Sequence, residues 1–411
     1  MSTIVLKNLP KQFAKIGFIL CTCLLILGVL AANRLPERLY TSSPKEISLS
    51  FPIPMVAKPA PLLSADGQQP ENGYQASIQL FGIIPIGSAK VKIADTDTVV
   101  LGGNPFGIKI LSDGVLVVGF NDVETPNGKV NPAKQAGLKE GDLILTVNNK
   151  TLTTNTELVK LVEGSNGKSL TIRARRDAKR FTVTVIPQKS TDGHYRAGMW
   201  VRDSTAGLGT MTFYHPESGM YGGLGHGVCD ADTGQIMSLA QGEIVGAQIN
   251  GLHKATAGKA GELRGSLVDN LQLGSILRNC KNGVYGHLYE PPQSGQVLRV
   301  ARKQEVKKGA ATLYTCVNGT VQPYACTIQR VNLKERADHH MVIRVSDPEL
   351  LSKTGGILQG MSGSPIVQNG KLVGAITHVF LNQPEKGYGI FAETMLENAK
   401  SAAKEQLKEA S

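Results

Sequence analysis

The sequence lacks the residue patterns of several common functional sites. Neither Cys-x-x-Cys nor His-Glu-x-x-His occurs, although there are 6 cysteines and 8 histidines, so a zinc site is not expected. Aromatic and basic residues do not interleave as they do in nucleic-acid-binding modules. The Gly-x-Ser-x-Gly elbow of α/β-hydrolases is absent as well. We therefore expect no metal, no other cofactor and no nucleic-acid partner.

Aromatic residues are scarce, at 5%, whereas glycine is abundant, with 46 residues among 411. This composition is typical of a turn-rich, mainly β globular protein with two or three domains. The net charge is +11, of which Lys7, Lys11, Lys15 and Arg34 supply 4 before the first acidic residue, so residues 35–411 carry 11 − 4 = +7. A mildly basic surface of this kind suits work near an anionic membrane.

Residues 16–32 form a run without charge that follows three lysines. Such a run is either a cleaved signal peptide or a short signal anchor, and the preceding positive charge sends the rest of the chain across the membrane. We assign residues 1–34 to this segment, and the sequence leaves both alternatives open. The protein is thus expected to be exported and to be associated with the membrane through residues 16–32.

Residues 35–97 are expected to form a linker followed by a short β region. Residues 38–75 are rich in Pro, Ser, Ala and Gly, as in an extended linker, and a β pattern follows from residue 74.

Residues 98–188 have the pattern of a PDZ domain, which is an α+β module. The stretch 136–148, Ala-Gly-Leu-Lys-Glu-Gly-Asp-Leu-Ile-Leu-Thr-Val-Asn, carries the strongest signature. Residues 156–162 fit the groove helix, and residues 170–185 fit a closing hairpin. The loop at 102–108 occupies the expected position of a carboxylate-binding loop, beside which a peptide adds as a strand. The predicted peptide-binding residues are Gly103, Phe106, Gly107, Ile108 and Leu158.

Residues 189–411 read as short strands separated by glycine turns, the pattern of a β-barrel or a pair of barrels. A helix is expected at the end of the chain, from Glu393 to Lys408, with Met395, Ala399, Ala402 and Ala403 on its apolar face. Cys316 and Cys326 flank a turn at Asn318-Gly319, where a disulfide across the hairpin is plausible in an exported protein.

The stretch Gly360-Met361-Ser362-Gly363-Ser364-Pro365 is the strongest catalytic signal. A serine nucleophile must sit on a tight, exposed turn, where its own N–H and the N–H two residues earlier bind the oxyanion. Glycines permit such a turn. We therefore predict Ser362 as the nucleophile, with the oxyanion hole formed by Gly360 and Ser362.

His226 lies in the glycine-rich stretch Gly222 to Val228, ahead of Ser362 in the chain. A histidine there is a candidate general base, and the order of histidine before serine is that of chymotrypsin-like enzymes. Cys229 is a rival nucleophile, but it lacks the glycine-turn setting.

A charge-free N-terminal run, a PDZ domain and these two glycine-framed motifs occur together in this order. In that respect the chain resembles the SpoIVB family of serine peptidases of endospore-forming bacteria over about residues 10–411. The resemblance implies a chymotrypsin-like double β-barrel with catalytic His226, Ser362 and Asp347. It also implies export from the forespore into the intermembrane space and self-cleavage. The implied substrate is a membrane-bound regulator, whose cleavage releases an intramembrane protease that activates a late sigma factor.

Two questions stay open at this level. Asp230 and Asp232 lie close to His226 in the sequence and compete with Asp347, which precedes Pro348 and fits the start of a turn or helix equally well. The second question is whether the chain is a peptidase or a non-catalytic PDZ adaptor with degenerate barrels. The intact serine and histidine motifs favour the peptidase, whose partners would be a protein substrate and its own N-terminal segment.

Overall fold

The computed structural model describes residues 18, 19, 22, 26, 29, 35, 38–41, 47–49, 54–59, 73–93, 97–334 and 339–409. Strands predominate among them, which confirms a mainly β protein. Most of the charge-free run at residues 16–32 lies outside this part of the chain. Within the part described, no helix combines the length and the apolar character that crossing a bilayer requires.

The N-terminal strands form a small sheet of their own, in the order β1-β5-β4-β3-β2. Their bounds are β1 Arg38–Thr41, β2 Ile47–Leu49, β3 Met55–Pro59, β4 Gly73–Leu80 and β5 Ile84–Ile93. Met55 and Ala57 on β3 alternate inward and pack against Ile78 and Leu80 of β4. The prediction of an extended linker over 38–75 is therefore wrong for β1, β2 and β3. Proline and serine dominated the composition, but the alternating apolar positions determined the structure.

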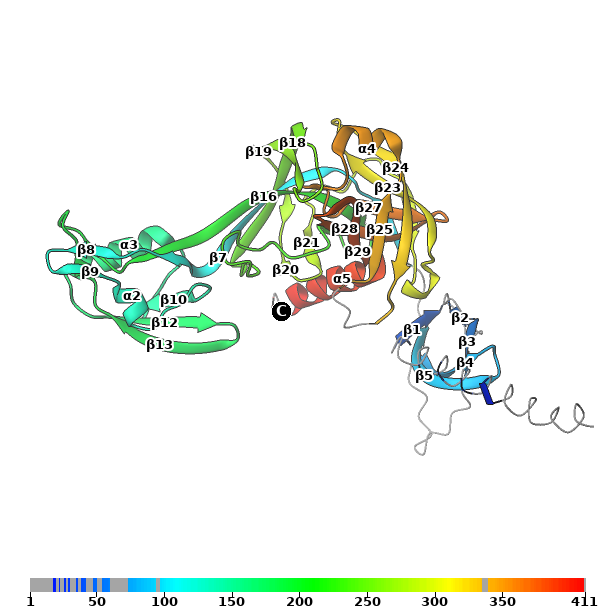
Figure 1. Ribbon diagram of the computed structural model, residues 1–411, viewed down its shortest axis with the longest axis horizontal. Helices are drawn as coiled ribbons and strands as arrows, with labels where there is room; N and C mark the ends of the chain where they lie inside the picture. The colour runs from blue at the N-terminus through cyan, green and yellow to red at the C-terminus, as the bar shows by residue number, and fades with distance from the viewer. Residues whose placement is uncertain are drawn as a thin grey trace, which may run out of the picture.

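Two long antiparallel strands join the PDZ domain to the barrels, β7 (Pro105–Phe120) and β16 (Met199–His215), as Figure 1 shows. Their outer halves pair within the PDZ sheet, where Met199 faces Phe120. Their inner halves pair within the barrel, where Thr210 faces Pro105. The PDZ domain is thus inserted into the barrel region, between two of its strands.

This topology corrects the start of the predicted PDZ domain at residue 98. Strand β6 (Thr98–Leu101) pairs with β16 and with β22 (Val297–Val300), and both of these partner segments belong to the barrels. The core of the PDZ domain begins only at Val115. An apolar strand pattern fits a barrel strand as well as a PDZ strand, so the sequence did not separate the two.

The remainder of the PDZ domain agrees with its sequence signature. Helix α3 (Asn155–Gly164) starts at a capping box formed by Thr154 and Glu157 and buries Leu158 and Val162. The predicted closing hairpin is β12–β13. The other elements are β8 Val123–Thr125, β9 Gly128–Val130, α2 Pro132–Gln135, β10 Leu143–Val147, β11 Lys150–Thr151, β12 Leu170–Arg176, β13 Lys179–Val185, β14 Gln188–Lys189 and β15 Tyr195–Arg196.

One apolar core of the barrel region lies around Phe106, Tyr221 and Val284, and another lies around Leu313 and Ile376. Strands near the first core are β17 Met220–Gly223, β18 Gln241–His253, β19 Gly261–Ser275, β20 Arg278–Cys280 and β21 Gly283–His287. Strands near the second are β23 Gly309–Cys316, β24 Val321–Val331, β25 Met341–Val345, β26 Leu358–Gln359, β27 Pro365–Gln368, β28 Lys371–Phe380 and β29 Gln383–Phe391, with η1 Lys303–Glu305 and α4 Pro348–Thr354.

The chain ends in helix α5 (Ala392–Glu409), which confirms the predicted C-terminal helix. Met395, Ala399 and Ala402 are buried, and they pack in a third cluster with Phe213 and Tyr285. The helix therefore packs against strands β16 and β21.

The prediction of a disulfide between Cys316 and Cys326 is wrong, because both thiols are free and buried. In the β23–β24 ladder Cys316 lies opposite Val321, whereas Cys326 lies opposite Ala311. The two sulfurs therefore do not face each other across the hairpin.

The insertion topology predicts where the chain tolerates removal of the PDZ domain. Leu111 and Ser204 are direct partners on β7 and β16, so replacing residues 112–203 by Asn-Gly closes a two-residue hairpin. This variant should fold. Deleting residues 98–188 should not give a folded protein, because it removes the buried Phe106, Ile108 and Ile110, whose burial contributes roughly 1.5–3 kcal/mol each. Circular dichroism with thermal melting checks both variants, and a cooperative transition in the 98–188 deletion would contradict this topology.

Candidate active site

Ser362 lies in the loop between β26 and β27, and the β27–β28 hairpin follows it. Gly360 and Gly363 have φ angles of +94° and +96°, in the left-handed region that favours glycine. A Cβ on Gly363 would lie 1.9 Å from the Thr210 carbonyl oxygen. The glycine is therefore required by close contact with β16 as well as by conformation.

The carbonyl groups of residues 360 to 363 in this loop are all hydrogen-bonded. The Gly360 carbonyl accepts from Thr210 Oγ1 at 2.8 Å, and the Ser362 carbonyl accepts from the Thr210 N–H at 2.9 Å. The Gly363 carbonyl accepts from Thr212 Oγ1 at 2.7 Å, and the Met361 carbonyl accepts from the Ser364 N–H at 2.9 Å. Two threonines of β16 thus fix the orientation of the serine loop.

The Ser362 hydroxyl donates to the Thr377 carbonyl on β28, at 2.7 Å. It is not hydrogen-bonded to His226 in this conformation.

The His226 loop lies directly against the serine loop. A Cβ on Gly363 would lie 2.6 Å from the Leu224 nitrogen, and a Cβ on Gly225 would lie 2.9 Å from Thr377 Cγ2. Leu224 and Gly225 both have positive φ, 62° and 70°, so the chain turns sharply just before the histidine. The structure therefore brings together the two segments that carry the predicted catalytic pair.

His226 Nδ1 lies 2.8 Å from the Gly227 carbonyl oxygen. A carbonyl can only accept, so Nδ1 carries the proton and Nε2 holds the lone pair of a base. Burial lowers the pKa of His226 and so favours the neutral form that can accept a proton.

Two further histidines line up beside His226. The His378 ring on β28 lies 4.7 Å from the His226 ring between centroids, and His339 lies 6.4 Å from His378 and stacks on Tyr388. Burial, with the neighbouring His226 and His339, lowers the pKa of His378 to about 4. The sequence did not indicate this cluster, because its members lie on segments far apart in the chain and share no motif.

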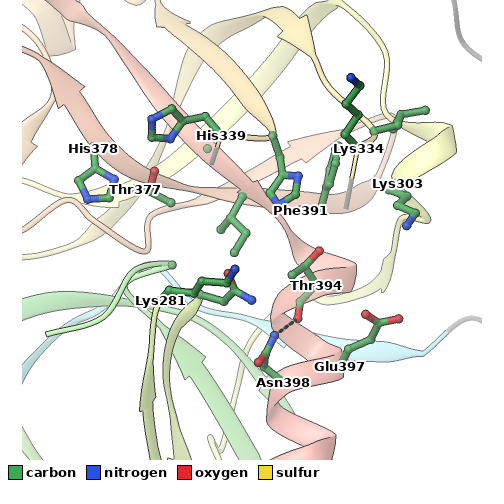
Figure 2. A pocket seen from close by; sticks show the side chains of 16 residues that line it. Lys281, Lys303, Lys334, His339, Thr377, His378, Phe391, Thr394, Glu397 and Asn398 are labelled. Atoms are coloured by element: carbon green, nitrogen blue, oxygen red, sulfur yellow. Dashed lines mark hydrogen bonds between the residues drawn. The ribbon is translucent and has the colours of Figure 1, made fainter. Parts of the chain in front are cut away.

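A pocket of about 430 Å³ opens beside Gly225 and Thr377. Three lysines and one glutamate line it, so its formal charge is positive. Figure 2 shows Lys281 and His378 on one side and Lys303 and Glu397 on the other. The remaining lining residues are Asn282, Leu333, Lys334, His339, His340, Gly389, Ile390, Phe391, Thr394 and Asn398.

Known proteins resemble both halves of this architecture. The family model described as SpoIVB peptidase S55 matches residues 193–396, and a PDZ domain model matches residues 131–176. The chain belongs to the SpoIVB peptidase S55 family. The matched regions contain Ser362, His226 and the PDZ signature.

Curated relatives share only short stretches with this S55 chain. A putative zinc metalloprotease of Lactococcus lactis is 41% identical over 71 residues, 17% of this chain and 16% of that protein. The zinc metalloprotease RasP of Geobacillus kaustophilus is 31% identical over 107 residues, 26% of this chain and 22% of that protein. The chain thus spans about a fifth of the length of either relative, and it lacks the His-Glu-x-x-His motif.

Two solved structures are similar in part. The PDZ domain of an SdrC-like protein from Listeria monocytogenes has a TM-score of 0.18 at 19% identity, covering 22% of this chain and 87% of that one. The inactive form of the Rv3671c protease has a TM-score of 0.27 at 12% identity, covering 47% of this chain and 84% of that one.

Asp347, the acidic residue that the S55 resemblance implies, is the N-cap of α4. Its carboxylate accepts from the Leu350 N–H at 3.0 Å and from the Ala325 N–H at 3.2 Å. The Leu350 bond is the main cause of the lowered pKa of Asp347. No hydrogen bond joins Asp347 to His226 among the described residues, so its catalytic role stays a prediction.

The two alternatives, Asp230 and Asp232, bind Arg202 and not His226. Cys229, the rival nucleophile, has its pKa raised by burial and by the neighbouring Asp230, which disfavours the reactive thiolate.

The predicted PDZ groove is in the wrong place. Phe106, Gly107 and Ile108 pair with β16 and β18 inside the first barrel, where the Phe106 ring makes an edge contact with Tyr221. The Gly103 N–H donates to the Met211 carbonyl, also within the barrel. Leu158 does lie on the PDZ helix, but it is buried in the domain core.

The free edge beside α3 is the outer half of β16. At Met199–Arg202 this strand pairs with β7 alone, and Gly198 just before it has a φ of +78°. Trp200 and Val159 are both more than half exposed there, at 63% and 57%. The signal in the sequence was Ala197-Gly198-Met199-Trp200-Val201, a glycine followed by an apolar strand after the closing hairpin.

One group of side chains approaches metal-ligand spacing among the residues that the structure covers, namely Asp97, His215 and Glu217. The Lys400 ammonium already binds Asp97, and His215 Nε2 lies 3.6 Å from the same carboxylate.

Replacing the cap residue separates a structural role of Asp347 from a catalytic one. Asp347→Ala should lower the free energy of unfolding by about 1 kcal/mol, whereas Asp347→Asn should lose less, because asparagine also caps helices. The pKa of Asp347 is depressed in the folded state, so its contribution is present above the unfolded pKa and is lost as the pH falls. Denaturant titrations at neutral and acidic pH measure both effects. An Asp347→Asn protein that is as stable as wild type but has no peptidase activity would show that Asp347 has a catalytic role.

Proposed function

We propose that the protein is a serine endopeptidase in which Ser362 is the nucleophile and His226 the general base. The main support is that the two glycine-framed loops pack against each other, with the serine loop fixed by Thr210 and Thr212. The two apolar cores suit a chymotrypsin-like double barrel, in which the catalytic pair lies where two barrels meet.

The reaction begins with rotation of the Ser362 hydroxyl from the Thr377 carbonyl to His226 Nε2. The oxygen attacks the substrate carbonyl carbon while its proton moves to Nε2. The resulting oxyanion accepts hydrogen bonds from the N–H groups of Gly360 and Ser362. Imidazolium then protonates the leaving amine, and water, activated by the same histidine, hydrolyses the acyl-enzyme.

The Gly227 carbonyl orients His226 in this scheme. It holds the proton on Nδ1, which is the task that a carboxylate performs in the usual triad. Asp347 acts through the placement of α4, which leads through Gly355 and Gly356 to the serine loop.

Membership of the S55 family supports a proposal for the biological role. We place the protein in the intermembrane space of the forespore, anchored by residues 16–32 until it cleaves itself. Its substrate is a membrane-bound regulator, whose cleavage frees an intramembrane protease for activation of a late sigma factor. The PDZ domain binds substrate as an added strand along Met199–Val201, beside α3.

The alternative, a non-catalytic PDZ adaptor, requires neither a reactive serine nor a neutral histidine. The tautomer of His226 that leaves its lone pair on Nε2 and the lowered pKa of this histidine have no use in an adaptor.

Ser362→Ala and His226→Ala should each abolish peptide-bond cleavage and leave the fold unchanged. Loss of either member of such a pair costs about 10⁴-fold or more in rate. Cleavage of a protein substrate is followed on gels, and a fluorophosphonate probe reports the reactivity of Ser362. Ser364→Ala is the matched control, since that hydroxyl is fully buried and donates to Thr315. Persistent cleavage in Ser362→Ala would eliminate the mechanism.

Self-cleavage should occur within about residues 40–75 but outside Met55–Pro59. A tethered segment has a high effective concentration at its own active site, whereas β3 is paired on both sides and must unfold before it is cut. N-terminal sequencing of the shed protein should give starts in this window from wild type and none from Ser362→Ala. The same starts in the serine variant would mean that another protease makes the cut.

A further inference from the structure

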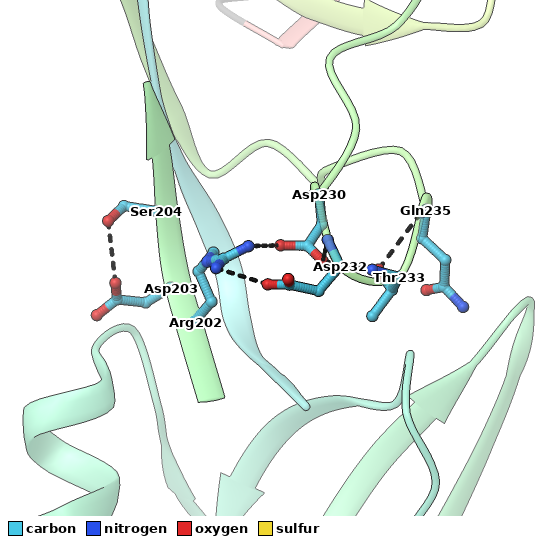
Figure 3. A network of polar contacts seen from close by, with 7 residues as sticks. All are labelled: Arg202, Asp203, Ser204, Asp230, Asp232, Thr233 and Gln235. Carbon is cyan, nitrogen blue, oxygen red and sulfur yellow. Dashed lines mark hydrogen bonds and ion pairs between the residues drawn. The ribbon is translucent and has the colours of Figure 1, made fainter. Parts of the chain in front are cut away.

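Arg202 joins the PDZ end of β16 to the loop that follows the catalytic histidine. Its Nη1 pairs with Asp230 Oδ2, and its Nη2 lies 2.7 Å from Asp232 Oδ2 (Figure 3). The Asp230 side chain is 0% exposed, whereas Asp232 is half exposed. The arginine is therefore the cationic partner of a fully buried carboxylate.

Asp230 organises the turn that it occupies. Its Oδ1 accepts from the Thr233 N–H at 2.8 Å and from Thr233 Oγ1 at 2.9 Å, and its own N–H donates to the Gln235 carbonyl at 2.8 Å. Burial alone would raise the pKa of Asp230, but the bonds from Thr233 and Arg202 hold it below its usual value. The residue is ionised, so removal of Arg202 leaves a buried charge without its counter-ion.

This turn is the tip of a short arm, residues 228–237, that begins two residues after His226. Cys229 and Ile236 form a bridge across the arm, and the Met237 N–H donates to the Val228 carbonyl. Asn279 of β20 donates to the carbonyls of Val228 and Met237 at 2.9 Å each. The barrel thus holds the base of the arm, and Arg202 holds its tip.

Arg202 is also tied to the PDZ domain. The β7–β16 ladder has a bulge between Arg202 and Ser204, and successive strand residues point to opposite faces. Asp203 accepts at 2.7 Å from the N–H of Asn155, the first residue of α3. On the arm's side, a Cβ on Gly141 of the PDZ domain would lie 2.1 Å from Gln235 Nε2. The arm therefore contacts Gly141 of the PDZ domain through Gln235, and it contacts Arg202 at the PDZ end of β16 through Asp230 and Asp232.

We propose that Arg202 is a positioning residue through which the PDZ domain sets the placement of His226. A peptide added along Met199–Val201 would fix the conformation of the strand that leads directly into Arg202. The guanidinium, through its contacts with Asp230 and Asp232, would in turn fix the position of the arm. The inference rests on the proposed peptidase function. Arg202 touches neither substrate nor the reacting atoms, and its effect reaches them through the arm.

The surroundings of His226 determine what a displaced arm would change. His378 faces it from β28, with His339 behind, and Lys281 of the β20–β21 turn lines the adjoining pocket. Cys229 follows it on its own segment. Movement of the arm toward solvent would relieve burial, so the pKa of His226 should rise toward its ordinary value.

The test compares Arg202→Gln with Arg176→Gln in the full-length protein. Arg176 is a matched control: it also pairs with a fully buried carboxylate, Asp142, and it is equally exposed, at 35%. Arg176 is not bonded to the arm. Both variants should be less stable than wild type. Only Arg202→Gln should change the rate at which Ser362 is labelled and the pH at which His226 titrates.

Two measurements are made on each variant. The rate at which a fluorophosphonate labels Ser362 should fall about 10²-fold in Arg202→Gln, the scale of a small misplacement of a catalytic group. Its pH profile should move to higher pH, because a base with a raised pKa becomes neutral later. The His226 resonance, assigned with His226→Gln, should titrate at correspondingly higher pH in NMR spectra. Arg202→Lys keeps the charge but not the two-pronged contact, so it should lie between wild type and Arg202→Gln.

An Arg202→Gln protein with the labelling rate and His226 midpoint of Arg176→Gln would overturn the proposal. If Arg202→Gln fails to fold, Arg202→Gln combined with Asp230→Asn removes the buried charge and permits the same comparison. If wild type is not labelled at Ser362, the peptidase function fails, and the NMR titration still decides the role of Arg202.

Discussion

The hydrogen bonds that Thr210 and Thr212 donate to the serine loop are the constraint on which the rest of the site depends. A loop with two left-handed glycines has many alternative conformations, and fixing one requires partners for its carbonyls. Both partners lie on β16, the strand that also carries Arg202 and the free edge of the PDZ domain. One strand therefore links the free edge of the PDZ domain to the segments that carry Ser362 and His226.

The insertion of the PDZ domain between two barrel strands explains why β16 has this role. A domain attached by one flexible linker could move without consequence for the barrel. Here both connections, β7 and β16, are paired with each other along most of their length and enter the first apolar core. Leu116 and Leu143 of the PDZ domain share that core with Met237 of the arm. Rearrangement of the domain must therefore be transmitted into the barrel, or be resisted by it.

The sequence predicted the parts of this protein that are local in the chain. The glycine turn around Ser362, the PDZ signature at 136–148 and the C-terminal helix all rest on spacing within a short window, and the structure contains each of them. The prediction from sequence misplaced the groove, because the alternation of apolar residues around Phe106 and Ile108 is the same in a barrel strand and in a PDZ strand. The neighbourhood of His226 could not be predicted either. Thr377 and His378 of β28 reach its segment by tertiary packing, which no local pattern encodes.

The electrostatics of His226 bear on whether a carboxylate partner is needed at all. In a triad the carboxylate holds the tautomer and stabilises the imidazolium, and it also raises the pKa of the histidine. Here a backbone carbonyl holds the tautomer, while burial lowers the pKa of His226 and so keeps the imidazole neutral. Such a base is ready to accept a proton but holds it weakly, so the imidazolium is the costly species along the reaction.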